Sequence, residues 1–192
     1  NSSDHDFSPS ISADGLSLFF TSNRSGGIGD LDVWVTNRET TDDPWGEPVN
    51  LGPTINSPRH EYGVSVSSDG LSLYFDTSQL GSITFWNDLW VVTRATTDDG
   101  WSNPVSLGPT VNSSDDDYSP SISADGLSLF FMSNRSGNYD LWVTTRAAID
   151  DDWSHPVNLG PTVNSSAAEA DPGISADGRM LFFSSKRPGG SG

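Results

Sequence analysis

The sequence repeats itself with a period of roughly 55 residues. The tetrapeptide SADG, or SSDG in the second copy, recurs with its glycine at Gly15, Gly70, Gly126 and Gly178. An asparagine stands at the same distance before each of these glycines, at Asn1, Asn56, Asn112 and Asn164. A period of this size is typical of one β-propeller blade, so each repeat is expected to be one supersecondary unit that packs against its neighbours.

Each repeat contains short β-prone runs separated by turn residues, and no window has the apolar spacing of an amphipathic helix. In the first repeat, the predicted strands are 9–12, 16–22, 32–36 and 47–51. Asp14-Gly15 is predicted to form a two-residue hairpin turn of the primed type, in which both central residues have positive φ. The third strand carries DVWV, which recurs as DLWV in the next two repeats, and the fourth ends in LGPT.

The second predicted strand is apolar on both faces. In LSLFF, Leu16, Leu18 and Phe20 lie on one side and Phe19 on the other, so a sheet of such strands must be covered twice. Radial stacking of identical sheets provides this cover. A flat β-solenoid or two packed sandwiches would contain such strands but do not explain a long repeat with a four-strand meander. The sequence therefore predicts an all-β fold, a β-propeller of four-stranded antiparallel blades.

The repeats divide a single domain, 1–192, into units 1–55, 56–111, 112–163 and 164–192. The last unit contains the hairpin and MLFFSSKR but neither a D-L-W nor a W-x-x-P-V segment. Three complete blades and half of a fourth are predicted, which is a partial propeller. Single-chain propellers have about four to eight blades. We therefore expect either an excised fragment of a longer propeller or several chains that together complete one ring.

The repeat signature resembles a known family. The string D-x-S-P-S-I-S-A-D-G-L-S-L-F-F-x-S-N-R-S-G, followed by D-[LV]-W-V and W-x-x-P-V-x-L-G-P, is similar to the TolB-like, WD-like β-propeller repeat of bacterial exported proteins. The resemblance covers essentially the whole chain and implies blades around a central channel, with the first strand of each repeat innermost. Such repeats occur in periplasmic TolB, in OmpA-linked envelope proteins and beside hydrolases, so the resemblance does not assign a function.

The composition excludes several partners. Nine Lys and Arg against 26 Asp and Glu give a net charge of −17, which repels nucleic acid and anionic lipid headgroups. No apolar run approaches the roughly 20 residues that span a bilayer. The absence of Cys excludes disulfides, thiolate zinc sites and Cys nucleophiles. The bias toward Asp, with a single Lys, suits an exported protein that is periplasmic, at the cell surface or secreted.

Four carboxylates recur at one position of the repeat, five residues after its opening Asn: Asp6, Glu61, Asp117 and Glu169. A ring of carboxylates at the rim of the channel could hold a hard cation such as Ca²⁺. Alternatively, each could pair with the Arg of S-N-R, at Arg24, Arg135 and Arg187, with Gln79 in its place in repeat two. The structural interpretation is preferred, because binding sites usually break the symmetry of a repeat. No bound cofactor is predicted.

Other acidic groups are predicted to be solvated turns. Asp4, Asp6 and the run 115–117 form clusters that lack the Gly and Glu of an EF-hand. The Asp pairs before the repeated Trp are expected in exposed turns. The Asp that opens each D-[LV]-W strand is expected to bind a nearby Ser or backbone amide, and the Trp residues that occur once per blade are expected to pack between blades.

The candidate ligand-binding residues are aromatic or imidazole side chains. An insertion in repeat two, 81–87, contains Phe85 and Trp86, which could form either a recognition loop or a hydrophobic plug. His5 and His60 occupy equivalent positions, so neither is a unique general base. Exposed aromatic rings could also stack on sugars.

No residue is predicted to be catalytic, because the sequence lacks the G-x-S-x-G, H-E-x-x-H and P-loop motifs. We expect a non-catalytic interaction scaffold with a protein partner or self-association. A carbohydrate- or calcium-binding propeller is the first alternative, and a paired-carboxylate glycoside hydrolase is the second.

Overall fold

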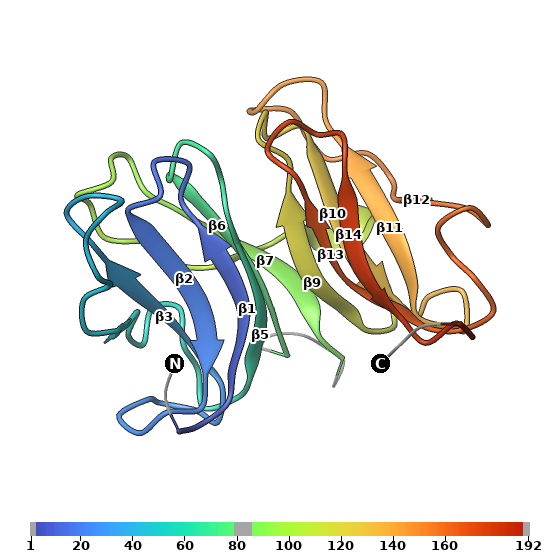
Figure 1. Cartoon of the computed structure of the whole chain (residues 1–192). Coiled ribbons are helices and arrows are strands. Elements are labelled where there is room, and N and C mark those ends of the chain that lie inside the picture. The colour runs from blue at the N-terminus through green and yellow to red at the C-terminus, as the bar shows by residue number, and fades with distance from the viewer. Residues whose placement is uncertain (1–2, 79–85, 190–192) are drawn as a thin grey trace.

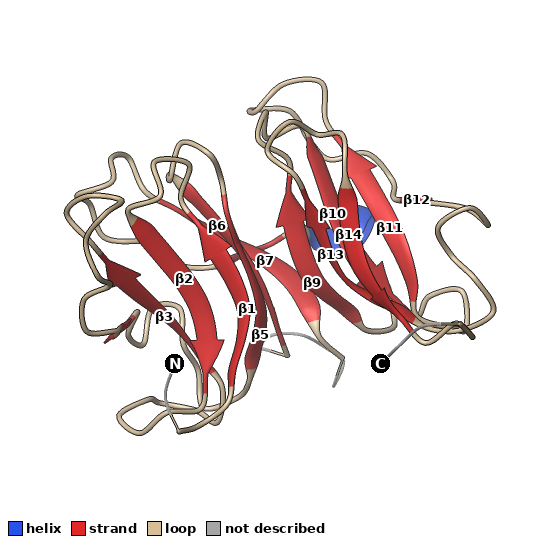
Figure 2. Cartoon of the chain, viewed as in Figure 1, coloured by secondary structure: helices blue, strands red, loops and turns tan. Residues whose placement is uncertain are grey.

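The computed structural model describes residues 3–78 and 86–189. In this part of the chain, the regular structure is almost entirely antiparallel strands (Figure 2). The exception is a single helical turn, α1 (Gly108–Val111), which follows the last strand of the second blade. None of the helices in the described residues is long and apolar enough to cross a membrane.

Three sheets have four strands and one has two, each in simple meander order. Blade one contains β1 (Asp6–Ile11), β2 (Ser17–Ser22), β3 (Asp32–Asn37) and β4 (Val49–Asn50). Blade two contains β5 (Glu61–Val66), β6 (Ser72–Thr77), β7 (Asp88–Thr93) and β8 (Val105–Ser106). Blade three contains β9 (Asp117–Ile122), β10 (Ser128–Ser133), β11 (Asp140–Thr145) and β12 (Val157–Asn158). Blade four contains β13 (Glu169–Ile174) and β14 (Leu181–Ser185). The predicted blade architecture is thus confirmed.

The first strands of the four blades lie side by side, in the order of the blades, along a central channel. β1 contacts β5, β5 contacts β9, and β9 contacts β13. Figure 1 shows β1 and β5 in the left half of the molecule and β9 and β13 in the right half. These strands line a cavity of about 640 Å³. Each blade begins at the channel and ends at the outside, so the start of every inner strand lies at the same rim.

Apolar side chains between successive blades form the core. Phe19 and Val33 of blade one pack against Leu73 and Phe75 of blade two. One blade further on, Tyr74 and Leu89 pack against Leu129 and Phe131. The repeated Trp residues belong to these interfaces, since Trp101 meets the edge of Phe19 and Trp153 meets the edge of Tyr74. Covering both faces of each sheet therefore requires a neighbouring blade on each side, as the sequence predicted.

The hairpin prediction was wrong about the type of turn. Gly15 has φ +73°, but Asp14 does not have positive φ. The Gly15 N–H donates to the Ser12 carbonyl, so the β-turn is 12–15 and the glycine follows its two central residues. The Asp14 carboxylate accepts bonds from the Leu16 N–H and the Ser12 hydroxyl, which stabilises this turn without left-handed backbone at Asp14.

The predicted strand limits also need correction. The first strand begins at Asp6 rather than at residue 9, because pairing with β2 continues across a bulge between Phe7 and Ser10. Ser8, at φ +47°, forms this bulge immediately before Pro9, which has no N–H to donate. The fourth strand is shorter than predicted, with two residues in β4.

Candidate functional site

Three of the four repeated carboxylates form ion pairs with the predicted arginines. The Arg24 guanidinium lies 2.7 Å from Asp6, that of Arg135 lies 2.5 Å from Asp117, and that of Arg187 lies 3.1 Å from Glu169. Asp117 and Glu169 are completely buried. Asp117 and Glu169 also accept bonds from the N–H and hydroxyl of the Ser four residues earlier, Ser113 and Ser165. Each carboxylate therefore holds the loop that enters its blade.

Glu61 has the same place in blade two but a different set of partners. The Ser57 hydroxyl donates to Glu61 at 2.7 Å and the Thr77 hydroxyl at 3.1 Å, and the side chain is completely buried. Burial raises the pKa of Glu61 to about 7, although the bonds from Ser57 and Thr77 oppose the shift. Gln79, which replaces the arginine in this repeat, lies outside the described residues.

The metal interpretation of these carboxylates stays a prediction. Within 3–78 and 86–189, no three His, Asp or Glu side chains are grouped so that they could hold a metal ion. The prediction that residues 115–117 form a solvated loop was wrong for Asp116 and Asp117, because both side chains are buried. Asp116 accepts the Asn87 N–H, and its own N–H donates to Asn134. This acidic run is therefore part of the contact between blades two and three.

The opening Asn of the repeat also joins blades, a role that the sequence analysis did not assign. The Asn56 amide is buried, accepts the Val33 N–H and donates to the Val33 carbonyl. Asn112 does the same with Leu89, as Asn164 does with Leu141. The side-chain amide thus bonds both backbone groups of one residue in the third strand of the preceding blade. Its constant spacing from the Asp-Gly turn was the signal that could have identified it.

The wall of the channel is poor in ionisable groups. Ser, Pro, Gly, Ala and branched aliphatic residues line most of it, and Asp171 is the one ionisable side chain among the described lining residues. Asp171 accepts the Ser119 hydroxyl at 3.0 Å. Asp76 lies behind this wall, completely buried, and accepts the N–H groups of Gly63 and Ser119 through the same oxygen. Burial raises the pKa of Asp76 to about 8.

Aromatic side chains gather at the rim where the inner strands begin. His60 stacks on Tyr62 with ring centroids 5.2 Å apart, Tyr62 meets Tyr118 edge-on at 5.8 Å, and Tyr118 contacts Tyr139 at 6.3 Å. We call His60, Tyr62, Tyr118 and Tyr139 the aromatic row. On blade one, His5 and Phe7 form a separate stack at 5.8 Å.

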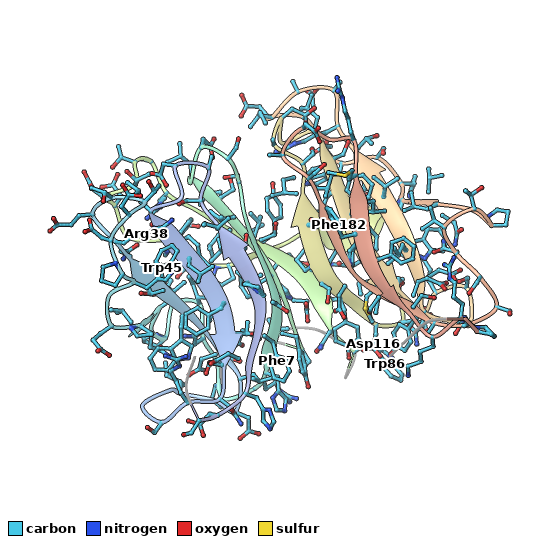
Figure 3. The ribbon with its side chains drawn as sticks, viewed as in Figure 1. Phe7, Arg38, Trp45, Trp86, Asp116 and Phe182 are labelled. Atoms are coloured by element: carbon cyan, nitrogen blue, oxygen red, sulfur yellow. The ribbon has the colours of Figure 1, made fainter. Side chains whose placement is uncertain are left out.

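Carboxylates surround the aromatic row. The Tyr139 hydroxyl donates to Asp116 at 3.1 Å, and Asp30 lies 3.7 Å from His60 Nε2. Burial raises the pKa of Tyr118, and the negative charge of Asp116 raises it further. The three phenols of the row therefore stay neutral, with the carboxylates of Asp116 and Asp30 beside them. Figure 3 shows Phe7, Trp86 and Asp116 toward the same end of the molecule.

The structure brings three of the four predicted ligand-binding residues to this end of the blades. His60 is part of the row, and His5 has the equivalent place on blade one. Trp86 is 45% exposed and precedes Asn87, whose N–H binds Asp116. Phe85 lies outside the described residues. Phe7, Tyr62 and Tyr118 were missed, although one aromatic residue directly after the repeated carboxylate in three repeats was a visible signal.

The comparisons with known proteins identify the fold. No protein-family model matches the chain, and no curated protein sequence matches it. The structure of TolB from Acinetobacter baumannii is similar, with a TM-score of 0.64 at 18% identity over 98% of this chain and 39% of that one. A protein described as TolB from Agrobacterium tumefaciens gives a TM-score of 0.61 at 18% identity, over 98% of this chain and 56% of that one.

A third solved structure is similar as well. Bacteroides ovatus GH43B, from a xyloglucan locus, gives a TM-score of 0.57 at 14% identity, over 95% of this chain and 36% of that one. The chain thus spans between about a third and just over half of these three proteins. At such identities the likeness concerns the fold alone. The repeat signature, the meander sheets and these likenesses agree that this chain has a TolB-like β-propeller fold, in three complete blades and the inner half of a fourth.

Proposed function

We propose that this chain is a non-catalytic β-propeller module of an exported bacterial protein, and that it acts as an interaction scaffold for a polypeptide partner within a larger ring of blades. One observation carries the proposal. The aromatic side chains at the rim of three blades stay partly exposed, with Tyr62 at 37% and Phe7 at 48%. Partly exposed aromatic residues are typical of protein-binding surfaces.

The channel offers little chemistry to a substrate. A glycoside hydrolase needs two carboxyl groups on either side of the scissile bond. Asp171 reaches the channel wall, whereas Asp76 is completely buried behind it. Three of the repeated carboxylates are held in ion pairs, and Glu61 is held by hydroxyl groups. These observations favour a binding module over an enzyme.

Export is supported by the likeness to TolB structures and by the Asp-rich, Lys-poor composition. A carbohydrate ligand is the second candidate, and the exposed indole of Trp86 favours it, because an aromatic face matches the apolar face of a sugar ring.

A parallel screen tests the proposal. The immobilised chain is presented with a random peptide library and with a glycan array, and turnover is measured on chromogenic glycosides. We expect the library to yield peptides that bind the wild-type chain and no longer bind Tyr118→Ser. The same peptides should still bind the matched control Val105→Ser, on the exposed outer strand β8. Selective glycan binding would replace the proposal with the carbohydrate module. Turnover that depends on Asp171 would replace it with a hydrolase.

A further inference from the structure

Arginine side chains lie over aromatic rings in every blade, but none of these contacts that the structure describes involves a ring of the aromatic row. In each complete blade, an arginine lies over the Trp before the outermost strand, as Arg38 lies 4.3 Å from the Trp45 ring centroid. Arg24 and Arg135 lie over Phe and Trp rings nearer the row. Within the described residues, all such contacts involve Phe or Trp. The faces of the three tyrosines therefore carry no arginine of this chain.

The groups near the row make a cation the matching ligand. An aromatic face is the negative part of the ring quadrupole and attracts a guanidinium or ammonium group within about 6 Å. Asp116 behind Tyr139 and Asp30 beside His60 add negative charge. Arg24 and Arg135 are already paired with Asp6 and Asp117. Arg187 is paired in the same way with Glu169, and Arg59 is exposed in the loop directly before His60.

The row is also asymmetric within the repeat. An aromatic residue follows the repeated carboxylate in blades one to three, but it is a tyrosine only in blades two and three, at Tyr62 and Tyr118, and Ala170 has this place in blade four. The residue before the carboxylate is His5 in blade one, His60 in blade two and Asp116 in blade three, whereas Ala168 has this place in blade four. A purely structural role would be repeated in every blade. The row therefore belongs to one sector of the rim, over blades two and three.

The geometry points to a specific role for this sector: the aromatic row binds a cationic side chain, the guanidinium of Arg or the ammonium of Lys, presented by the polypeptide partner. This inference rests on the proposed function and deepens it. The cation lies against Tyr118 and against the face of Tyr62 that the stacked His60 leaves uncovered, with Asp116 and Asp30 supplying negative charge. The phenols stay neutral, because burial raises the pKa of both above its ordinary value.

Calorimetric titration of the whole chain with a defined peptide tests the inference. The probe is acetyl-(Gly-Arg)₄-amide at about 150 mM salt, a concentration that screens diffuse surface attraction. The matched probe replaces each arginine with citrulline, which has the same shape without the charge. We expect binding of the arginine peptide, and at least about tenfold weaker binding of the citrulline peptide. This comparison needs no variant that could fail to fold.

Variants then locate the site. Tyr62→Leu removes the aromatic face from a partly exposed position and is expected to weaken binding about tenfold, whereas Tyr62→Phe keeps the face and should bind within about twofold of the wild type. The matched charge control is Asp98→Asn. Asp98 is exposed in the turn after β7, at the other end of the blade from the row. Its loss should leave the affinity unchanged.

Three results would overturn the inference. Equal affinity for the arginine and citrulline peptides would exclude a cation site. Equal weakening by Asp98→Asn and Tyr62→Leu would show diffuse attraction by a chain of net charge −17. Binding of neutral library peptides at the rim, with none of the arginine probe, would refute the cation and leave the proposed scaffold function standing.

Discussion

At the scale of single residues, the carboxylate five residues after the opening Asn has a structural role in every blade, but its bonding partners differ between blades. Asp6, Asp117 and Glu169 each hold an arginine, while Glu61 holds hydroxyl groups. The difference appears in the pKa values of Glu169 and Glu61. Burial alone would raise the pKa of Glu169, but bonds from Ser165, Ser185 and Arg187 outweigh it and lower the pKa to about 2. Without a cation, the pKa of Glu61 rises to about 7.

Asp117→Asn should lower the free energy of unfolding by about 3 kcal/mol, because it leaves the Arg135 guanidinium without its counter-charge in a mostly buried place. Urea denaturation measures the loss, and Asp98→Asn in an exposed turn is the control that should change little. Calcium should stabilise neither protein. Saturable, micromolar calcium binding that disappears in Asp117→Asn would instead identify a metal site.

Stability should fall as the pH rises from about 5 to about 8. The folded state raises the pKa of Glu61 from 4.5 to about 7 and that of Asp76 from 3.8 to about 8, so it binds more protons than the unfolded chain in this interval. Each group then costs on the order of 1 kcal/mol per pH unit. Urea denaturation at several pH values measures the slope, which Glu61→Gln and Asp76→Asn should each reduce. A stability that increases over this range would contradict the assignment.

At the scale of elements, the hairpin turns and the inner-strand bulges decide how each blade is built. Gly126 and Gly178 occupy the same turn position with φ +70° and +69°. They differ in their surroundings. A Cβ on Gly126 would lie 2.6 Å from Ile149 Cδ1, whereas a Cβ on Gly178 would have no neighbour within 4 Å. The two glycines therefore separate backbone strain from steric contact.

Gly178→Ala should cost about 1 kcal/mol of stability, the price of left-handed backbone in an alanine. Gly126→Val should cost more, on the order of 1 to 3 kcal/mol, because a β-branched residue resists positive φ and must also displace Ile149. Thermal unfolding measures both. Equal losses for Gly126→Ala and Gly178→Ala would show that Ile149 moves aside freely.

At the scale of the whole molecule, each end of the blade array presents residues equivalent to those that pack between successive blades. Phe182 is 60% exposed, although its equivalents Phe19 and Tyr74 are buried against the next blade. At the other end of the array, the Trp45 side of blade one has no described blade in front of it, as Figures 1 and 3 show. The contact that Phe19 makes with Trp101 is thus available between Phe182 and Trp45 of separate copies.

This 192-residue polypeptide should therefore self-associate as its concentration rises. Phe182→Ser should weaken the association, while Val157→Ser on the exposed outer strand β12 should not. Sedimentation velocity over a range of concentrations measures the effect. A compact monomer at every concentration, with protected amides throughout β14, would contradict it.

The sequence by itself determined the blade. The Asp-Gly spacing, the strands that are apolar on both faces and the repeated carboxylate–arginine pattern are local or periodic signals, and each predicted a contact that the structure contains. The tertiary structure decided what depends on neighbouring blades. It buries Asp116, so this residue is not a surface charge, and it places Tyr62, Tyr118 and Tyr139 together although they come from separate repeats.

The same limit applies to the turn and to the pKa values. Asp-Gly is compatible with more than one hairpin turn, and the hydrogen bonds of Ser12 and Asp14 select one of them. Glu61 resembles its three counterparts in sequence, yet its protonation depends on desolvation by the surrounding blades and on groups far along the chain. Periodicity specifies which residues face a neighbouring blade. Only the packing of the blades determines how strongly each ionisable group is desolvated, and desolvation shifts its pKa.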